Sequence, residues 1–278
     1  MTRVGAKSVA GRTVKEAAAL ADRVWPPRPG VVALLYHRVG GRSEAAEIDL
    51  PAAVFDQQMA WLAAHGTATD LDAALVALAE PFDERPPRHP VVVTFDDGTA
   101  DMVDVALPIL ARHGVPAVWY LATDFVERGR AFPGGGTPLS WAGAKEAVDS
   151  GLVTLGSHTH THALLDRLDP AAAADELDRS VDLIGERVGV AVDHFAYPKA
   201  VPPSPEVEPL VRDRFRSAAL GGNRANTYGT TDPHRLSRSV IQRRDGMRFF
   251  THKARGGMAL EESARRRLDR LRYAYSKE

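Results

Sequence analysis

Two short runs of polar side chains, well separated in the sequence, contain the residue types that a hydrolytic metal site requires. The first is Asp96-Asp97-Gly98, which directly follows an apolar run. The second begins at His158 and ends at His162, and it also follows an apolar run. One carboxylate and two imidazoles can hold a divalent ion that activates water, and a second carboxylate is then free to move protons. The two runs therefore predict a hydrolytic metal centre.

The spacing within each run suggests which side chains bind the ion and which do not. His158 and His162 are four residues apart, which places both imidazoles on one face if the chain turns helically after the strand. His160 would then point elsewhere, and it is left out of the predicted ligand set. A single histidine here would most simply cap a turn, but three in five residues beside an Asp pair favour metal binding. Adjacent residues of an extended chain point in different directions, so one of Asp96 and Asp97 can bind the ion while the other faces the substrate.

Apolar, β-branched runs alternate with helical patterns along most of the chain. The strands are expected at residues 31–36, 91–95, 117–121, 153–156, 192–196 and 216–220. Apolar residues at three-and-four spacing predict helices around residues 55–62, 102–109 and 177–188. Strands that alternate with helices indicate a parallel sheet with crossover connections.

The polar side chains gather at the carboxyl ends of four of these strands. They are His37, the Asp96-Asp97 pair, the histidine cluster and the run Tyr197-Pro198-Lys199. In a (β/α) barrel all strand carboxyl ends converge on one mouth, whereas an open doubly wound sheet gathers ligands only near its switch point. Contributions from four separate strands therefore predict an α/β fold of the (β/α) barrel type, with the active site at the carboxyl-terminal mouth.

The composition bounds the function. The chain has 278 residues, of which 44% are hydrophobic, enough for one large α/β domain or two smaller ones. With 35 basic and 36 acidic residues, the net charge of -1 gives no general attraction to nucleic acid or anionic lipid. There are no cysteines, so His, Asp and Glu are the good metal ligands that remain. Neither a leader nor a membrane-spanning run is recognisable, and we expect a cytoplasmic protein.

The expected organisation has three parts: an N-terminal extension at residues 1–30, a catalytic barrel at residues 31–255 and a basic C-terminal helix at residues 256–278. The helix contains the run Arg265-Arg266-Arg267-Leu268-Asp269-Arg270-Leu271-Arg272. Such a run is most simply a solvated face, and peripheral contact with an anionic membrane is the alternative. Nothing in the sequence indicates an oligomeric state.

The motifs resemble those of a known family, the polysaccharide deacetylases of carbohydrate esterase family four. Its first motif is similar to Thr94-Phe95-Asp96-Asp97-Gly98, and its histidine motif to His158-Thr159-His160-Thr161-His162. Further similar segments, over about residues 31 to 255, are Leu139-Ser140-Trp141, Asp149-Ser150-Gly151-Leu152 and Phe195-Ala196-Tyr197-Pro198. The resemblance implies a distorted (β/α) barrel that uses one divalent ion, expected to be zinc with cobalt, nickel or manganese as alternatives, to deacetylate N-acetylated sugars. It also implies that Asp96 is the general base and that Asp97, His158 and His162 bind the ion.

The reaction also needs an acid that protonates the leaving amine. The late Leu-x-x-His motif that usually supplies it is not found, because His234 and His252 lack its surroundings. Tyr36-His37 is similar to an early motif of the poly-N-acetylglucosamine deacetylases, the subgroup whose motif order this chain resembles most. His37 is therefore the candidate acid, and a strand-end residue hydrogen-bonded to a loop is the alternative reading.

The third motif departs from the family pattern in two ways. It continues with Lys199-Ala200 in place of an aromatic residue and glycine, although the Lys199 backbone N–H could still serve an oxyanion. Lys199, Tyr197 and Trp141 are the candidates for substrate or oxyanion contact. The basic residue often found in this motif is also absent, so Asp96 is expected to lack its usual Arg partner and to have a different pKa.

Two other functions stay open besides the deacetylase. One is a metal-dependent amidase or deformylase that acts on a non-sugar metabolite, and the other is a catalytically silent carbohydrate-binding protein. The intact Asp pair and the two ligand histidines favour an enzyme, because a binding module does not need both carboxylates. For a cytoplasmic deacetylase we expect a small N-acetylated sugar conjugate as substrate in preference to chitin.

Overall fold

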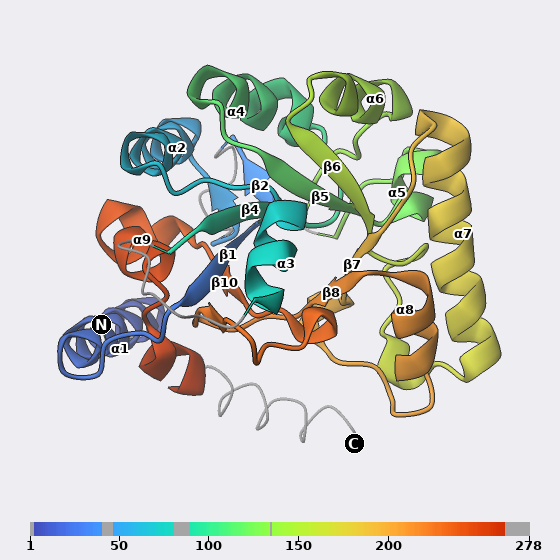
Figure 1. The fold of residues 1–278 in the computed structure, drawn as a ribbon. Helices are drawn as coiled ribbons and strands as arrows, with labels where there is room; N and C mark the ends of the chain where they lie inside the picture. Colours follow the sequence, from blue (N-terminus) through green and yellow to red (C-terminus); the bar gives the residue numbers. More distant parts are fainter. Residues whose placement is uncertain (1–2, 41–46, 81–88, 134, 265–278) are drawn as a thin grey trace.

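The protein is built around one twisted, mostly parallel sheet with helices on its outer side (Figure 1). The computed structural model describes residues 3–40, 47–80, 89–133 and 135–264. Seven parallel strands follow the order β10-β1-β4-β5-β6-β7-β8, and β9 adds to β1 in the antiparallel direction. The bounds are β1 Gly30–Tyr36, β4 Val91–Phe95, β5 Ala117–Leu121, β6 Val153–Ser157, β7 His194–Ala196, β8 Ser217–Ala219, β9 Asn226–Thr227 and β10 Arg238–Val240. A separate parallel pair is formed by β2 Arg38–Val39 and β3 Asp49–Leu50.

Helices follow most of the strands. They are α1 Arg3–Val24, α2 Ala52–His65, α3 Leu71–Ala79, α4 Leu107–His113, α5 Thr123–Arg128, α6 Trp141–Asp149, α7 Pro170–Val188, α8 Glu208–Arg214 and α9 Gly246–Ala254. A π-helical turn, Met102–Ala106, leads into α4. Within the described ranges, short 3₁₀ turns occur at Leu165–Arg167, Pro198–Ala200, Pro233–Arg235 and Arg243–Asp245. Among the described residues, no helix combines the length and the apolar character needed to cross a bilayer.

The two edges of the sheet meet through the residues that lead into β10. The Leu220 N–H donates to the Leu236 carbonyl at 2.7 Å, and the Leu236 N–H donates to the Ala218 carbonyl at 3.0 Å. Two residues later the same segment becomes β10, which pairs with β1. The sheet thus curls into the distorted (β/α) barrel that the sequence predicts.

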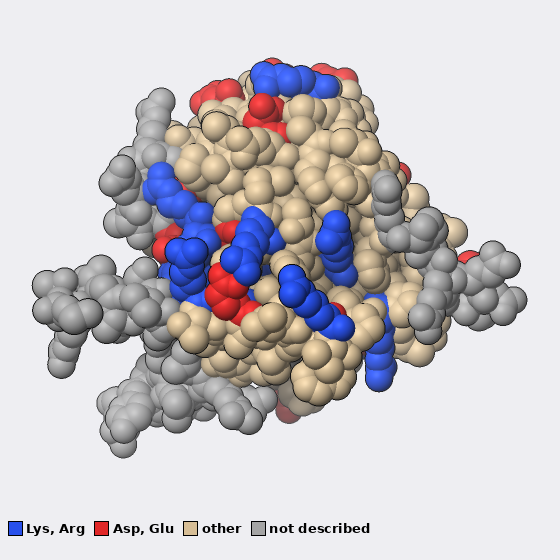
Figure 2. Space-filling model, turned by 90° about the vertical axis from the view of Figure 1, so that its left-hand side faces the viewer, with Lys and Arg blue, Asp and Glu red and all other residues tan. Residues whose placement is uncertain are grey.

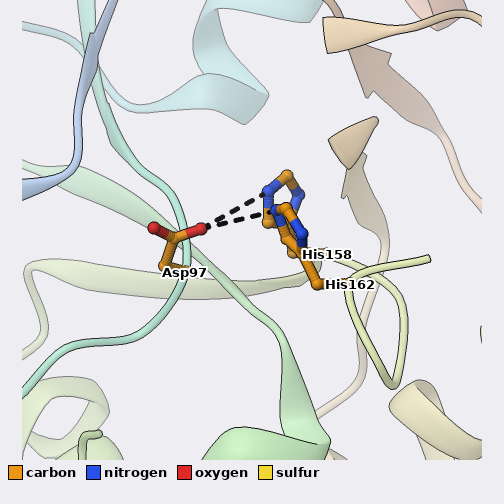
Figure 3. A group of neighbouring side chains, drawn as sticks. All are labelled: Asp97, His158 and His162. Carbon is orange, nitrogen blue, oxygen red and sulfur yellow. Dashed lines mark ion pairs between the residues drawn. The ribbon is translucent and has the colours of Figure 1, made fainter. Parts of the chain in front are cut away.

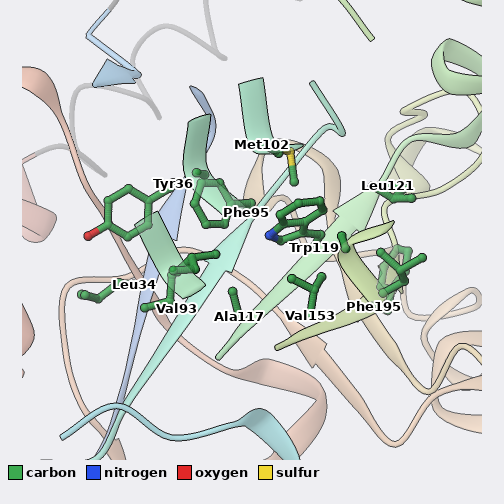
Figure 4. Packing of buried hydrophobic residues seen from close by; sticks show 14 of the residues in the cluster. Leu34, Tyr36, Val93, Phe95, Met102, Ala117, Trp119, Leu121, Val153 and Phe195 are labelled. Atoms are coloured by element: carbon green, nitrogen blue, oxygen red, sulfur yellow. The ribbon is translucent and has the colours of Figure 1, made fainter. Parts of the chain in front are cut away.

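The period of two along each strand decides which residues face the inside of the barrel. Val92, Val118 and Ala196 face inward, where they form one apolar cluster with the residues of α3. Their neighbours Phe95 and Phe195 face outward and belong to the main core under the outer helices (Figure 4).

The inward set continues to the chemistry-bearing residues at the strand ends. Counting in twos from Val92 leads to Asp96, and the same alternation leads to His37 beyond β1 and to His158 beyond β6. The segment before α3 hydrogen-bonds to the first residue of β4, so α3 covers the amino-terminal end of the barrel. The carboxyl-terminal mouth is therefore where these side chains meet.

The predicted strands are confirmed to within two residues at each end.

The segment predicted as an N-terminal extension, residues 1–30, consists largely of the helix α1. This helix packs on α9 through Ala18 and Phe249, and its buried Lys15 ammonium lies 2.5 Å from the Asp245 carboxylate. The residues from 265 onward, which carry the basic run of the expected C-terminal helix, lie outside the described residues.

Candidate metal centre

Asp97, His158 and His162 come together at the barrel mouth (Figure 3). One carboxylate oxygen of Asp97 lies 3.6 Å from Nε2 of His162 and 3.9 Å from Nε2 of His158. All three potential ligand atoms lie within 4.8 Å of one another. The set that the sequence and the family resemblance assign to the ion is thus brought together by two separate loops.

The loops reach this geometry through left-handed backbone conformations. Thr159 and His162 have φ values of 61° and 63°, so the chain after β6 is not helical, and the expected helical turn is wrong. Asp97 has a φ of 79° and is followed by Gly98, where a β-carbon would lie 3.0 Å from Leu121. Such conformations cost about 1–3 kcal/mol for residues with side chains and are found preferentially at functional sites.

The middle histidine of the cluster points away from the ligand set, as the sequence predicts. Nδ1 of His160 lies 2.9 Å from the Thr123 hydroxyl, and Nε2 lies 3.7 Å from the Asp124 carboxylate. Both partners belong to the first turn of α5. His160 therefore fastens the ligand loop to the neighbouring helix.

The donor atoms of the two ligand histidines suit a divalent ion. Nδ1 of His158 lies 2.7 Å from the Ala196 carbonyl and donates to it, which leaves the Nε2 lone pair toward Asp97. Burial and the neighbouring His158 and Lys199 lower the pKa of His162 to about 4, against the opposing effect of Asp97, so its imidazole is neutral at pH 7. Two imidazoles and one carboxylate, with Asp97 and His162 partly exposed, fit an open catalytic zinc-type site.

The second carboxylate, Asp96, is held by an arginine that comes from another strand. Two guanidinium nitrogens of Arg238 donate to the two Asp96 oxygens at 2.6 and 2.8 Å, and both side chains are almost fully buried. The expectation that Asp96 lacks an Arg partner is wrong. Arg238 lies on β10, opposite Ala33, and its side chain extends inside the barrel past Thr94 to reach Asp96.

This pairing fixes the charge of Asp96. Burial alone would raise the pKa of Asp96, but Arg238, His158 and His37 together outweigh burial and lower the pKa to about 2. Asp96 is therefore ionised throughout the neutral range, and Oδ2 of this carboxylate lies 3.8 Å from Nε2 of His158. An ionised carboxylate that is bound to an arginine and lies beside the ligand set can accept a proton without leaving its place.

His37 lies near both carboxylates. Burial lowers the pKa of His37, and the charges of Asp97 and Asp96 oppose that effect in part. Nδ1 of His37 is buried and has no hydrogen-bond partner among the described residues, although the backbone carbonyl accepts a bond from the Thr99 hydroxyl at 3.5 Å. A buried imidazole nitrogen without a partner is uncommon and points to a role with a bound molecule.

The three predicted substrate-contact residues lie in different surroundings. Tyr197 follows the inward-facing Ala196, so its ring faces outward, packs on Phe195 and places its hydroxyl 3.5 Å from the His234 carbonyl. Its side chain is thus directed away from the mouth. Trp141 donates its indole N–H to Glu127 of α5 at 2.7 Å, within a contact between outer helices.

Lys199 is the member of this group that lies close to the ligand set. It is exposed, it has a φ of 53°, and its positive charge helps to lower the pKa of His162. Its backbone N–H has no acceptor among the described residues, because the bonds of this turn run from the next two N–H groups, those of Ala200 and Val201. An N–H group in this place is available to an oxyanion.

The other two histidines considered as acids are engaged elsewhere. Nε2 of His234 lies 2.7 Å from the Phe215 carbonyl, and His252 on α9 lies 3.1 Å from the Asp22 carboxylate of α1. These contacts explain why neither of them is directed into the mouth.

The fold and the site together define a class: a distorted (β/α) barrel with a two-histidine, one-aspartate cluster and an arginine-bound aspartate at its mouth. Residues 83–205 match the family model described as polysaccharide deacetylase. These residues, under half of the chain, match the polysaccharide deacetylase family, and the resemblance read from the motifs is confirmed.

Curated relatives agree with this family assignment. The chain is 28% identical over 167 residues to the putative polysaccharide deacetylase YxkH of Bacillus subtilis, covering 59% of this chain and 55% of that protein. It is 30% identical over 151 residues to the poly-β-1,6-N-acetyl-D-glucosamine N-deacetylase of Escherichia coli, covering 50% of this chain and 22% of that protein. The chain thus matches about half of the first relative and under a quarter of the second.

Solved structures confirm the fold. IcaB from Ammonifex degensii aligns with a TM-score of 0.67 at 26% identity, covering 82% of this chain and 98% of that one. The Streptococcus pyogenes deacetylase PplD, solved with acetate, aligns with a TM-score of 0.68 at 22% identity, covering 78% of this chain and 94% of that one.

Proposed function

We propose that this protein is a metal-dependent hydrolase that removes the acetyl group from an N-acetylated amino sugar. The observation that carries the proposal is the placement of the arginine-bound Asp96 beside the Asp97, His158 and His162 cluster. The cluster offers three ligands for an ion, and Asp96 remains outside it as a proton acceptor. The family model and the names of the relatives support amide deacetylation as the reaction.

Each residue at the mouth has a separate task in this proposal. Asp97, His158 and His162 would hold the ion, which when bound polarises the acetamide carbonyl and makes water more acidic. Asp96 accepts the proton of the attacking water, because Arg238 keeps it ionised and oriented. The Lys199 backbone N–H donates to the oxyanion as it forms.

His37 supplies the proton that the leaving amine requires. Its lowered pKa leaves the imidazole mostly neutral at pH 7 but makes the protonated form a stronger acid, so the protonated fraction transfers its proton readily. The partnerless Nδ1 supports this role, because nothing among the described residues competes for it. Asp96 and His37 are thus the base and the acid of the proposed reaction.

We infer N-acetylglucosamine units as the substrate class, because three of the relatives are named as deacetylases of its β-1,6-linked polymer. The cytoplasmic location expected from the sequence stays a proposal, and it would favour a small conjugate over a polymer. Cell fractionation tests the location: recovery of the protein from the medium or the outer envelope would contradict it.

The activity test is acetate release from three kinds of N-acetyl compound: β-1,6-linked N-acetylglucosamine oligomers, a nucleotide-linked N-acetylglucosamine and a non-sugar N-acetyl amide. Protein reconstituted with zinc should release acetate from the sugars, and chelator-treated protein should not. Turnover of the non-sugar amide alone would indicate the amidase function instead. Tight sugar binding without turnover of any compound would indicate the silent carbohydrate-binding protein.

A further inference from the structure

Exposed hydrophobic side chains in the described part of the chain concentrate around the C-terminal end of α1. Of six large hydrophobic side chains that are exposed there, four lie on α1 or directly after it. The fifth exposed side chain is that of Leu260. Its neighbour in the sequence, Ala259, lines a cavity that Trp25 also lines. The exposed fractions are 36% for Val14, 59% for Leu20, 67% for Val24, 74% for Trp25 and 49% for Leu260. Contiguous exposed apolar surface on a protein usually marks a site of contact with another protein or with a membrane.

This apolar surface is not a by-product of the packing of α1. Lys15, Ala18 and Ala19 face the body of the protein, where Lys15 pairs with Asp245 and both alanines are buried against α9. Leu20 and Val24 are four residues apart and therefore share one stripe of the helix, which lies outside that contact. The helix α1 thus has one apolar face that packs on α9 and a second apolar face that is exposed.

Arginines border the second face. Arg12, Arg23 and Arg28 are exposed, and the described residues give none of them an acidic partner. Figure 2 looks onto the side of the molecule where α1 and α9 lie, and it shows several Lys and Arg side chains spread over this face, with acidic side chains among those on one side of it. Other arginines nearby are already paired, such as Arg248 with Glu16.

A cavity of about 510 Å³ adjoins the stripe at Trp25. Arg28, Arg224 and Thr230 are among the residues that line it. Arg224 uses its Nε to donate to the Ser237 hydroxyl at 2.7 Å, which holds the guanidinium in place. Two carboxylates, Asp22 and Asp232, also line the cavity, and they already accept hydrogen bonds from the Met258 N–H and from Arg212. Guanidinium groups and hydroxyls bind phosphate oxygens, so Arg28, Arg224 and Thr230 offer donors to a phosphate beside the exposed indole.

We propose that Leu20, Val24 and Trp25, together with Arg23 and Arg28, form a docking surface for an anionic phospholipid bilayer. A helix at a lipid interface buries an apolar stripe that carries Trp and Leu, and its cations contact the lipid phosphates. A second copy of the chain is a poorer occupant, because a symmetric contact would bring like-charged arginines together. Trp25 lies just before β1 at the amino-terminal side of the barrel, so the catalytic mouth of a docked molecule faces away from the lipid.

The test is co-sedimentation of the full-length protein with vesicles, combined with tryptophan fluorescence. Vesicles of phosphatidylglycerol and phosphatidylcholine should bind the protein and shift the emission of exposed Trp25 to shorter wavelength, and pure phosphatidylcholine should bind it much more weakly. Trp25→Ser should lower the partition coefficient about 10-fold or more, because the indole no longer enters the interface. Arg28→Gln should lower it about 5-fold on anionic vesicles.

Matched controls come from the same chain. Val24 and Val76 are exposed to 67% and 63%, but Val76 lies on α3, so Val24→Ser should weaken binding and Val76→Ser should not. Equal binding by these two variants, no binding of the wild type to anionic vesicles, or equal binding to both vesicle types would each overturn the proposal. A concentration-dependent dimer that Trp25→Ser abolishes would assign the surface to a second copy. Acetate release from a soluble substrate is measured separately, so failure of this proposal leaves the proposed function intact.

Discussion

Replacement of Arg238 by methionine is the perturbation that examines the site most sharply, because it removes the charged guanidinium while keeping an unbranched, apolar side chain inside the barrel. The guanidinium forms two short bonds to Asp96, and both side chains are almost fully buried. Arg238→Met therefore leaves a buried carboxylate without its counter-charge. Loss of one partner of a buried pair costs about 3–5 kcal/mol.

The pKa of Asp96 gives a lower bound on this figure. The value is about 2 in the protein against 3.8 for an isolated carboxyl group. Because one pKa unit corresponds to about 1.4 kcal/mol, the surroundings favour the ionised form by roughly 2 kcal/mol even after the cost of burial. Without Arg238 only the cost of burial and the weaker effects of the histidines remain, so the total loss should exceed this amount.

The pH dependence has a definite sign. A carboxyl group whose folded pKa is depressed contributes stability that is complete above its unfolded pKa, near 3.8, and is lost as the pH falls toward 2. In Arg238→Met burial should raise the pKa of Asp96. At low pH the Asp96 carboxylate of the variant is then protonated, and the unpaired buried charge that destabilises the variant is removed. The stability difference between wild type and variant should therefore narrow between pH 7 and pH 3.

Urea unfolding followed by circular dichroism at pH 7, 5 and 3.5 measures these differences directly. Arg238→Lys keeps the charge but not the two-bond geometry and should lose less stability than Arg238→Met. In an Asp96→Asn background Arg238→Met should cost much less, since no charge is left unpaired. A loss below about 1 kcal/mol at pH 7, or a difference that does not depend on pH, would refute the electrostatic account of Asp96.

Three further predictions concern the mouth and the attachment of α1. His158→Ala should lose most of the bound zinc by elemental analysis, whereas His160→Ala, which removes a histidine from the same loop but no ligand, should retain it. His37→Ala should keep its metal and lower turnover of an N-acetyl amide by about 10²–10⁴-fold, with a smaller effect on an activated acetyl ester; equal rates on the amide would refute the role of His37 as acid. Lys15→Met should destabilise the protein by about 2 kcal/mol at pH 7, since Lys253 still pairs with the buried Asp245 carboxylate, and by less at pH 3, because the pKa of Asp245 is lowered; an unchanged urea midpoint at pH 7 would show that the ion pair does not stabilise the protein.

Much of the barrel could be predicted because its strands are short, apolar and β-branched. β4 and β5 have the predicted bounds, since each is a continuous run of residues that are buried on both faces. The clustering of Asp97 with His158 and His162 could be predicted as well, because these residues follow such strands directly. The topology then brought them to one mouth, as parallel strand ends require.

The features that were missed have local physical reasons. β10 has only three residues and contains Arg238, so its sequence does not have the apolar pattern of a buried strand. The charged side chain is buried only because it pairs with Asp96. The left-handed residues Thr159 and His162 cannot be recognised from spacing alone, because threonine and histidine rarely adopt that conformation. The outward direction of Tyr197 follows from the alternation along β7, a pattern that the sequence itself contains.

The central claim is that the two adjacent carboxylates have different tasks: Asp97 binds the ion and Asp96 moves the proton. The most direct test measures zinc content and acetate release together in Asp96→Asn and Asp97→Asn. Asp96→Asn should keep about one equivalent of zinc and lose at least about 10²-fold in turnover, whereas Asp97→Asn should lose both the zinc and the activity. Loss of zinc from Asp96→Asn together with full zinc in Asp97→Asn would contradict the account.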